Sequence, residues 1–300
     1  MKKTITFKIK NLFYMLLVCL VFIFGLHQKI YAVYTDEAPA KVIDILAIND
    51  FHGNVLGDSK NPGASKIIGY IKDRKANNPN TIVVSAGDNY KGTKISNSTF
   101  GKPVSEMFKA INLLASVVGN HEFDWGVDKI PTWAEEGGFD FLAANILDIK
   151  TGSLVEWAKP YKIVEIDGIK IAFIGLAHPD TPSFTKEKNT KGLVFIHPTP
   201  IAKEWVNFLK EGKAKEGVPD VIIALTHLDS ELNFITNEIK GKAVELANIE
   251  GIDGIITGHS HKVVVGKVND VPIVQAYYNG LAIGILSIKL DENNNVIDIE

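Results

Sequence analysis

Short apolar runs rich in valine and isoleucine recur along the chain, and several are separated by amphipathic stretches. Continuous apolar runs of this length suit strands that are buried on both faces. We expect strands within residues 42–50, 81–88, 115–122, 139–146, 162–176, 221–228, 251–261 and 272–290. We expect helices within residues 64–76, 102–114, 200–214 and 237–248. Strands that alternate with helices predict an α/β sandwich.

Turn signals indicate that the sheets of this sandwich are mixed rather than purely parallel. The dipeptide Asp167-Gly168 between two apolar runs predicts a β-hairpin. The final residues, 290–300, predict a second hairpin. Residues 177–200 predict a long surface loop, and the sequence has no internal repeat and no long Pro/Gly/Ser linker. Residues 33–300 are therefore expected to form one domain.

Polar residues interrupt this pattern at the carboxyl ends of five of the predicted strands. They are Asp50, His52, Asp88, Asn120, His121, Asp124, His227, His259 and His261. In α/β sheets the carboxyl ends of the strands converge on one crevice, which is where ligands bind. Because side chains alternate along a strand, we expect His259 and His261 to face this crevice together.

Each of these residues has an ordinary structural interpretation when it is taken alone. An aspartate after a strand is more often a turn residue or a helix cap than a ligand. Four histidines, two aspartates and one asparagine at successive strand ends nevertheless predict a metal site. By contrast, His178 and His197 each precede a proline inside the predicted long loop, and we expect both to be structural.

The first 32 residues differ from the rest of the chain. Lysines within residues 2–10 precede an apolar run at residues 12–26, and a small residue follows at Ala32. This pattern predicts a secretory signal peptide at residues 1–32. The alternative is an uncleaved membrane anchor, but the apolar run is shorter than the ~20 residues that a spanning helix needs. We therefore expect the protein to be secreted or held in the cell envelope, without a stable membrane span.

Charge and cysteine content narrow the chemistry further. The sequence has 32 Lys and Arg against 35 Asp and Glu, and five of the lysines lie in residues 1–32, which contain no acid. The rest of the chain is therefore near −8, which is unfavourable for binding nucleic-acid backbones. The single cysteine, Cys19, lies in the apolar run. A metal site in the mature chain must therefore use histidine, carboxylate, amide or water ligands.

The candidate residues belong to short motifs that follow one another along the chain. These are NDFHG (49–53), GDNYKG (87–92), GNHEFDWG (119–126), AANI (143–146), TH (226–227) and GHSH (258–261). With these motifs in this order, the sequence resembles the calcineurin-like metallophosphoesterases, and within them the secreted bacterial 5′-nucleotidase and 2′,3′-cyclic-nucleotide phosphodiesterase family. The resemblance implies a four-layer α/β/β/α sandwich of two mixed sheets flanked by helices.

The resemblance also implies two divalent metal ions, and mixed nitrogen and oxygen ligands suit Zn, Mn, Fe or Co. It assigns one ion to Asp50, His52, Asp88 and His261. It assigns the other to Asp88, Asn120, His227 and His259, so that Asp88 bridges the two. His121 is then a catalytic group over the substrate rather than a ligand, and Asp124 orients it. Paired cations neutralise a phosphate and lower the pKa of a bridging water, and a neighbouring histidine can protonate the leaving oxygen.

The function implied by this resemblance is a secreted metal-dependent phosphoesterase that hydrolyses nucleotide esters with a metal-bridging hydroxide. Its substrates would be small molecules rather than nucleic-acid polymers. One alternative is another metallo-hydrolase of the same fold, such as a thiosulfate-ester hydrolase. A second alternative is a non-catalytic exported metal-binding module, although metal binding alone would not require His121 and Asp124.

The sequence departs from the pattern of the family in two respects. The family's C-terminal substrate-binding domain, which supplies arginines and stacking aromatic rings, is expected to be absent from this chain. No residue can then be assigned to a nucleobase. The second departure is Lys94, within GDNYKGTKIS, where the family tends to have proline. We expect Lys91 and Lys94 to be solvated loop lysines rather than phosphate ligands.

Overall fold

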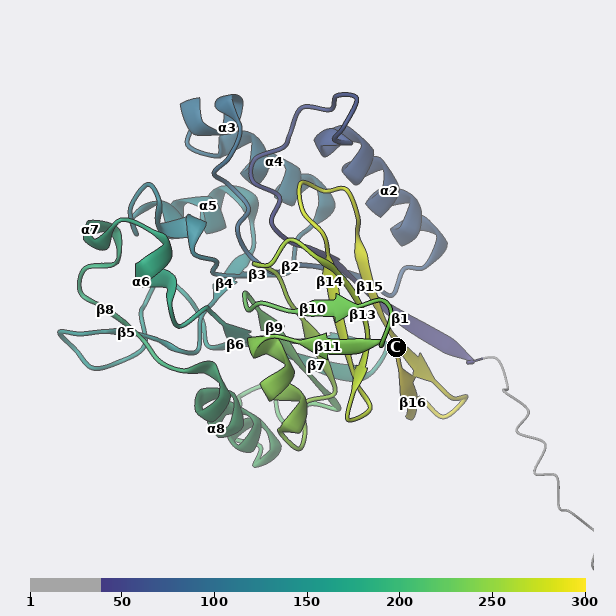
Figure 1. Ribbon diagram of the computed structural model, residues 1–300. Coiled ribbons are helices and arrows are strands. Elements are labelled where there is room, and N and C mark those ends of the chain that lie inside the picture. Colours follow the sequence, from purple (N-terminus) through teal and green to yellow (C-terminus); the bar gives the residue numbers. More distant parts are fainter. Residues whose placement is uncertain (1–38) are drawn as a thin grey trace, which may run out of the picture. The chain divides into compact units, whose positions relative to one another are not determined.

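The computed structural model describes residues 39–300, and the predicted signal peptide lies outside the described residues. One six-stranded sheet contains the strands β1 (Lys41–Ile48), β2 (Thr81–Ser85), β3 (Ala115–Val117), β4 (Asp140–Leu142), β15 (Gly284–Leu290) and β16 (Val296–Ile299). Their order across the sheet is β16-β15-β1-β2-β3-β4 (Figure 1). β1 to β4 are parallel, while β15 and β16 are antiparallel to their neighbours.

A second six-stranded sheet contains β6 (Tyr161–Ile166), β7 (Ile169–Leu176), β9 (Val221–Thr226), β12 (Gly254–Ile256), β13 (Val263–Val268) and β14 (Val271–Ala276). Its order is β13-β14-β12-β9-β7-β6, and only the two edge strands are antiparallel to their neighbours. Asp167 and Gly168 connect β6 to β7 with φ angles of 56° and 86°, which a tight two-residue hairpin turn favours. Both sheets are mixed, as predicted.

Hydrophobic side chains from both sheets form the layer between them. Ile45 and Val84 of the first sheet and Phe173 of the second are fully buried there. Leu46 points from β1 to the opposite face, where helices cover it. Both faces of β1 are therefore buried, which explains its continuous apolar run.

Helices cover the outer face of each sheet. The first sheet is covered by α2 (Gly63–Asn77), α4 (Lys102–Ile111) and α5 (Lys129–Gly137). The second sheet is covered by α8 (Pro198–Lys210) and the 3-10 helix η2 (Lys242–Asn248). Figure 1 shows α2, α4 and α5 on one side of the sheets and α8 on the other. This arrangement confirms the predicted four-layer α/β/β/α sandwich.

Two local predictions are wrong, and the first concerns residues 237–248. These residues do not form one helix: β11 (Glu238–Lys240) pairs with β10 (Glu231–Asn233), and η2 follows. Gly241 separates them with φ 117° and ψ 172°. A Cβ at this position would lie 2.3 Å from the carbonyl oxygen of Asp229. The glycine therefore interrupts a segment whose hydrophobic period alone favours a helix.

The second wrong prediction is the long loop at residues 177–200. This stretch contains α6 (Thr181–Phe184), α7 (Glu187–Thr190) and β8 (Leu193–Phe195), and α8 begins at its end. β8 pairs with β5 (Ile146–Asp148) in a small antiparallel sheet. Helices of four residues are too short to display a hydrophobic period, so the sequence pattern could not reveal them.

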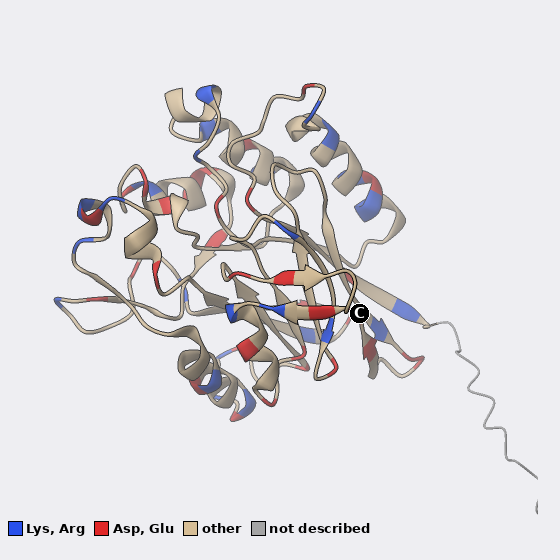
Figure 2. Cartoon of the chain, in the orientation of Figure 1, with Lys and Arg blue, Asp and Glu red and all other residues tan. Residues whose placement is uncertain are grey.

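Charged side chains of both signs occur throughout the described part of the chain. Figure 2 shows lysine and arginine interspersed with aspartate and glutamate over the helices, turns and strands that the structure describes. None of the helices within residues 39–300 is both long enough and apolar enough to span a membrane.

Candidate metal centre

The candidate ligands lie in loops beyond the strands rather than on the strands themselves. β1 ends at Ile48 and β12 ends at Ile256. The backbone φ angle lies between 48° and 73° at Asp50, His52, Asp88, His259 and His261. Residues other than glycine seldom adopt this left-handed conformation, and such strain gathers at functional sites. His259 and His261 therefore reach neighbouring clusters through left-handed loop conformations rather than through the alternation of a strand, on which the expectation was based.

The loop after β1 is held along the loop after β2. The backbone N–H of Asp50 donates to the carbonyl oxygen of Gly87 at 3.0 Å. The N–H of His52 donates in the same way to Asp88 at 3.0 Å. Gly119, in the loop after β3, leaves room beside them, because a Cβ there would lie 2.3 Å from Oδ1 of Asp88. The parallel pairing of the strands thus continues into the loops and holds the ligands close together.

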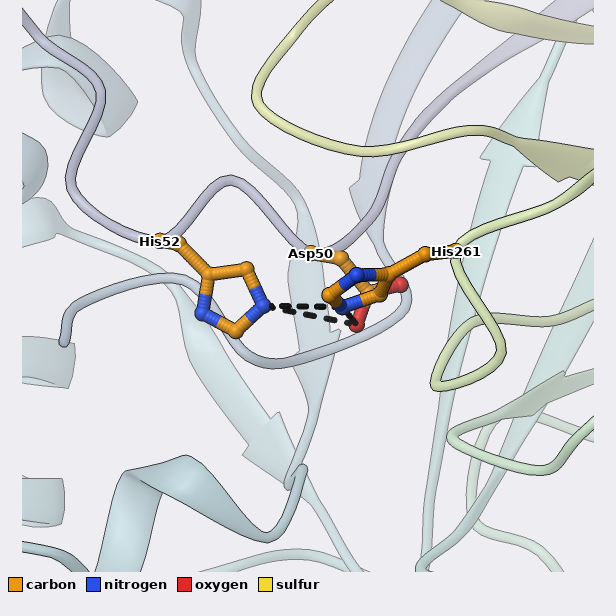
Figure 3. A group of neighbouring side chains, drawn as sticks. All are labelled: Asp50, His52 and His261. Atoms are coloured by element: carbon orange, nitrogen blue, oxygen red, sulfur yellow. Dashed lines mark hydrogen bonds and ion pairs between the residues drawn. The ribbon is translucent and has the colours of Figure 1, made fainter. Parts of the chain in front are cut away.

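The first cluster consists of Asp50, His52 and His261. The Nε2 atoms of the two histidines are 3.0 Å apart, and Oδ1 of Asp50 lies 3.3 Å from Nε2 of His261. Figure 3 shows both rings directed toward each other and toward the carboxylate, although they come from distant parts of the chain. Oδ1 of Asp50 is buried and has no hydrogen-bond partner. A divalent cation between these atoms would satisfy that oxygen, so the residues fit a metal site.

The second cluster consists of Asp88, His227 and His259, with Asn120 beside them. Nε2 of His227 lies 3.1 Å from Oδ2 of Asp88 and 3.2 Å from Oδ1 of Asn120. Oδ1 of Asn120 is also 3.0 Å from Nδ1 of His259. The Nδ1–H of His227 donates to the carbonyl oxygen of Ala86 at 2.6 Å, which directs Nε2 into the cluster.

The electrostatics of the second cluster favour a positive charge at its centre. Burial opposes a charge on His227, but the neighbouring Asp88 outweighs burial and raises the pKa of His227 to about 10. Burial likewise opposes the charge of Asp88, but His227 holds the pKa of that carboxyl well below its usual range. Burial lowers the pKa of His259 to about 4. The neutral imidazole of His259 is then free to bind a cation.

His121 and Asp124 form a hydrogen-bonded pair at the edge of the two clusters. Nδ1 of His121 lies 2.6 Å from Oδ2 of Asp124, and this contact raises the pKa of His121. The backbone N–H of His121 donates to Oδ1 of Asp88 at 2.8 Å. The side chain of His121 is 35% exposed, whereas that of Asp124 is 8% exposed. The imidazole can therefore reach a bound molecule while the carboxylate orients it.

Asp124 has two further partners that the sequence did not reveal. Nζ of Lys91 lies 2.7 Å from Oδ2 of Asp124, so the expectation that Lys91 is a solvated loop lysine is wrong. Thr185 donates from Oγ1 to Oδ1 of Asp124 at 2.9 Å. Lys94 is exposed, as expected. Only the tertiary structure brings Thr185 to this carboxylate.

Glu122 is the site residue that sequence reasoning missed, although it lies inside the GNHE motif. The side chain is fully buried, and its Oε2 accepts the N–H groups of Asp88 at 2.9 Å and Gly119 at 2.7 Å. Its Oε1 accepts the N–H of Asn89 at 2.7 Å. Burial and the charge of Asp88 raise the pKa of Glu122 to about 7. The carboxylate therefore joins the loops after β2 and β3.

The two histidines that we expected to be structural differ in position. His178 is buried, and its ring centroid lies 4.6 Å from that of His259. Nε2 of His178 also lies 3.4 Å from Oδ1 of Asp229. His178 thus packs behind a candidate ligand. His197 lies at the start of α8 with a half-exposed side chain, and the structure does not bring it into either cluster.

The fold and the paired histidine–aspartate clusters define a metal-binding α/β/β/α domain. The sequence profile of the family described as calcineurin-like phosphoesterase matches residues 43–263. The chain therefore belongs to the calcineurin-like phosphoesterase family, whose members use divalent metals. This agrees with the family resemblance found in the sequence.

Three relatives illustrate the range of this family. The chain is 30% identical over 280 residues to Endonuclease YhcR of Bacillus subtilis, covering 84% of this chain and 22% of that protein. It is 28% identical over 302 residues to human 5′-nucleotidase, covering 89% of this chain and 50% of that protein. It is 25% identical over 287 residues to the 2′,3′-cyclic-nucleotide 2′-phosphodiesterase/3′-nucleotidase of Yersinia enterocolitica, covering 86% and 43%. The chain thus spans half or less of the length of these relatives.

A solved structure supports the fold independently. The crystal structure of the calcineurin-like phosphoesterase YfkN from Bacillus subtilis superposes with a TM-score of 0.71 at 24% identity. The superposition covers 87% of this chain and 89% of that one. Two chains with this little sequence identity share the same arrangement of sheets and helices.

We expect the variant Glu122→Gln to be less stable than the wild type. The amide nitrogen would face backbone N–H groups and leave at least one buried donor unpaired, so the free energy of unfolding should fall by about 1–3 kcal/mol. Urea denaturation of the metal-free protein measures this change. The exposed Glu135 on α5 provides the control, because Glu135→Gln should change stability by less than about 0.5 kcal/mol. Equal stability of both variants would contradict the joining role of Glu122.

Proposed function

We propose that this chain is the catalytic domain of an exported phosphoesterase that uses two divalent metal ions to hydrolyse phosphate esters of nucleotides. The observation that carries the proposal is the junction of the two clusters with the His121–Asp124 pair. Oδ2 of Asp50 in the first cluster accepts the backbone N–H of His259 in the second at 2.9 Å. The ring centroids of His52 and His121 are 5.3 Å apart. All these groups therefore surround one small region.

The two clusters support the ligand assignment that the family resemblance implies. In this proposal one ion would be held by Asp50, His52 and His261 and the other by Asn120, His227 and His259, and the resemblance adds Asp88 as a ligand of both. When bound, such a pair of ions neutralises phosphate charge and supplies a nucleophile at neutral pH. Asn120 offers an amide oxygen without adding negative charge. Two aspartates among neutral ligands leave a net positive centre that attracts a phosphate.

His121 has the role of a general acid in this proposal. Its partly exposed imidazole carries a proton toward the leaving oxygen. Asp124 accepts from Nδ1 and thereby directs Nε2 outward. A module that only stored metal would not need this second carboxylate–histidine pair.

The substrate class rests on the relatives and on charge. Two of them are named for nucleotide esters, which supports small nucleotides as substrates. One is named an endonuclease, but the shared part is only 22% of that protein. The acidic composition of this chain after residue 32 disfavours a polymeric nucleic acid. Export rests on the signal-peptide pattern of residues 1–32.

The purified chain, supplied with Mn²⁺, Zn²⁺ or Co²⁺, should hydrolyse AMP, 2′,3′-cyclic AMP or p-nitrophenyl phosphate. Phosphate release measures the rate, and a chelator should abolish it until metal is restored. We expect weak discrimination among nucleobases. Full metal loading without hydrolysis of any phosphate ester would contradict the proposal and favour a metal-binding module. Hydrolysis of a thiosulfate ester alone would favour the other metallo-hydrolase.

The variant Asp88→Asn should lose both metal ions, because we place its carboxylate between them. Elemental analysis after metal reconstitution should give two ions per chain for the wild type and a clear loss for the variant. The exposed Asp73 on α2 supplies the control, and Asp73→Asn should retain both ions. A wild-type content of one ion or fewer would overturn the dinuclear assignment.

His121→Ala should keep both metal ions and the fold but lower kcat by roughly 10²–10⁴, the usual scale of general acid–base help. The loss of kcat should be largest for a substrate whose leaving group is a nucleoside alkoxide. It should be smaller for p-nitrophenyl phosphate, because nitrophenolate departs without a proton. Asp124→Asn should show a milder form of the same pattern. Steady-state kinetics on both substrates, with metal analysis, measure these effects. An equal loss on both substrates would instead indicate electrostatic stabilisation, and loss of metal would make His121 a ligand.

A further inference from the structure

Phe184 at the end of α6 exposes an aromatic face beside the candidate metal centre. The residue is 45% exposed. One side of its ring packs on two histidines, with centroid distances of 4.9 Å to His259 and 5.1 Å to His178. Phe184 is therefore anchored on a candidate ligand while much of its surface stays open to solvent.

The next residue in the chain connects Phe184 to the proposed general acid. Thr185 donates from Oγ1 to Oδ1 of Asp124 at 2.9 Å, and Asp124 holds His121 at 2.6 Å. The segment of Phe184 and Thr185 thus contacts both the second cluster, through His259, and the carboxylate that holds the proposed general acid.

The segment that carries Phe184 is held at both ends. Thr181 donates from its N–H and from Oγ1 to the carbonyl oxygen of His178, at 3.2 and 2.7 Å. At the other end, Asn189 donates from Nδ2 to the carbonyl oxygen of Asp124 at 3.2 Å. The ring is therefore prepositioned, so a ligand that stacks on it need not order the segment first.

We propose that Phe184 is the platform on which the flat ring of the organic leaving group stacks, whether that ring is the base of a departing nucleoside or another aromatic ring. This inference rests on the proposed phosphoesterase function and adds a substrate-contacting residue within this chain. Every base presents a π-face, so stacking on one phenyl ring is tolerant of base identity. The platform therefore selects flat aromatic leaving groups over small alkyl ones.

Two non-hydrolysable probes separate the ring from the phosphate. Phenylphosphonate and methylphosphonate carry the same headgroup, but only the first has a ring. Calorimetry with the metal-loaded protein should show that the wild type prefers phenylphosphonate. Phe184→Ala should reduce this preference by roughly tenfold, the scale of aromatic stacking on a base, and should leave the affinity for methylphosphonate unchanged.

Three further variants complete the test. Phe184→Leu keeps an apolar cover over His259 and should still lose the preference, whereas Phe184→Trp should retain it. Phe234 lies at the turn between β10 and β11 and is 73% exposed. Phe234→Ala should therefore behave as the wild type, because it removes a phenyl ring that contacts neither cluster.

The outcomes separate this inference from the function on which it rests. Failure of both phosphonates to bind would overturn the phosphoesterase proposal together with the platform. Binding of both with no preference for the ring, or an unchanged preference in Phe184→Ala, would overturn the platform alone. Loss of the preference only in Tyr278→Ala would also overturn it, because Tyr278 stacks on His261 at 5.1 Å in the first cluster.

Discussion

Two buried carboxylates beyond the ends of parallel strands are the constraint on which the rest of the site depends. Asp50 is 0% exposed and Asp88 is 2% exposed, and charges so far from water require a compensating partner. His227 compensates the charge of Asp88, whereas Oδ1 of Asp50 has no hydrogen-bond donor. The histidines of both clusters gather around these two carboxylates. A pair of divalent cations would satisfy both at once.

The backbone is strained at both of these carboxylates. Left-handed conformations at Asp50 and Asp88 bring the loops back over the sheet, and such strain persists only where the surroundings enforce it. Glu122 contributes to that enforcement, because its buried carboxylate accepts three N–H groups from two loops. Glu122 has no proposed chemical role, but it helps to hold the ligand loops in place.

Asp124 links the candidate metal centre to the surface that a substrate would meet. One oxygen of its carboxylate contacts His121 and Lys91, and the other accepts from Thr185. The segment of α6 and α7 is consequently joined to the same carboxylate that orients the proposed acid. The proposed proton transfer and the proposed recognition of the leaving group therefore both depend on Asp124.

The sequence alone determined the two mixed sheets and the identity of the candidate ligands. Apolar runs such as residues 42–50, rich in isoleucine and bounded by turn residues, favour buried strands, and few residue types bind metal at their ends. The tertiary structure decided how His259 and His261 reach their clusters, since both lie in left-handed loop conformations that strand alternation does not describe. It also decided the structure of residues 177–200 and the positions of Glu122 and Phe184. The structure of residues 177–200 depends on contacts such as that of Thr185 with Asp124, which lies 61 residues away in the sequence. A local hydrophobic period reports only burial within its own element, so contacts between distant segments leave no trace in it.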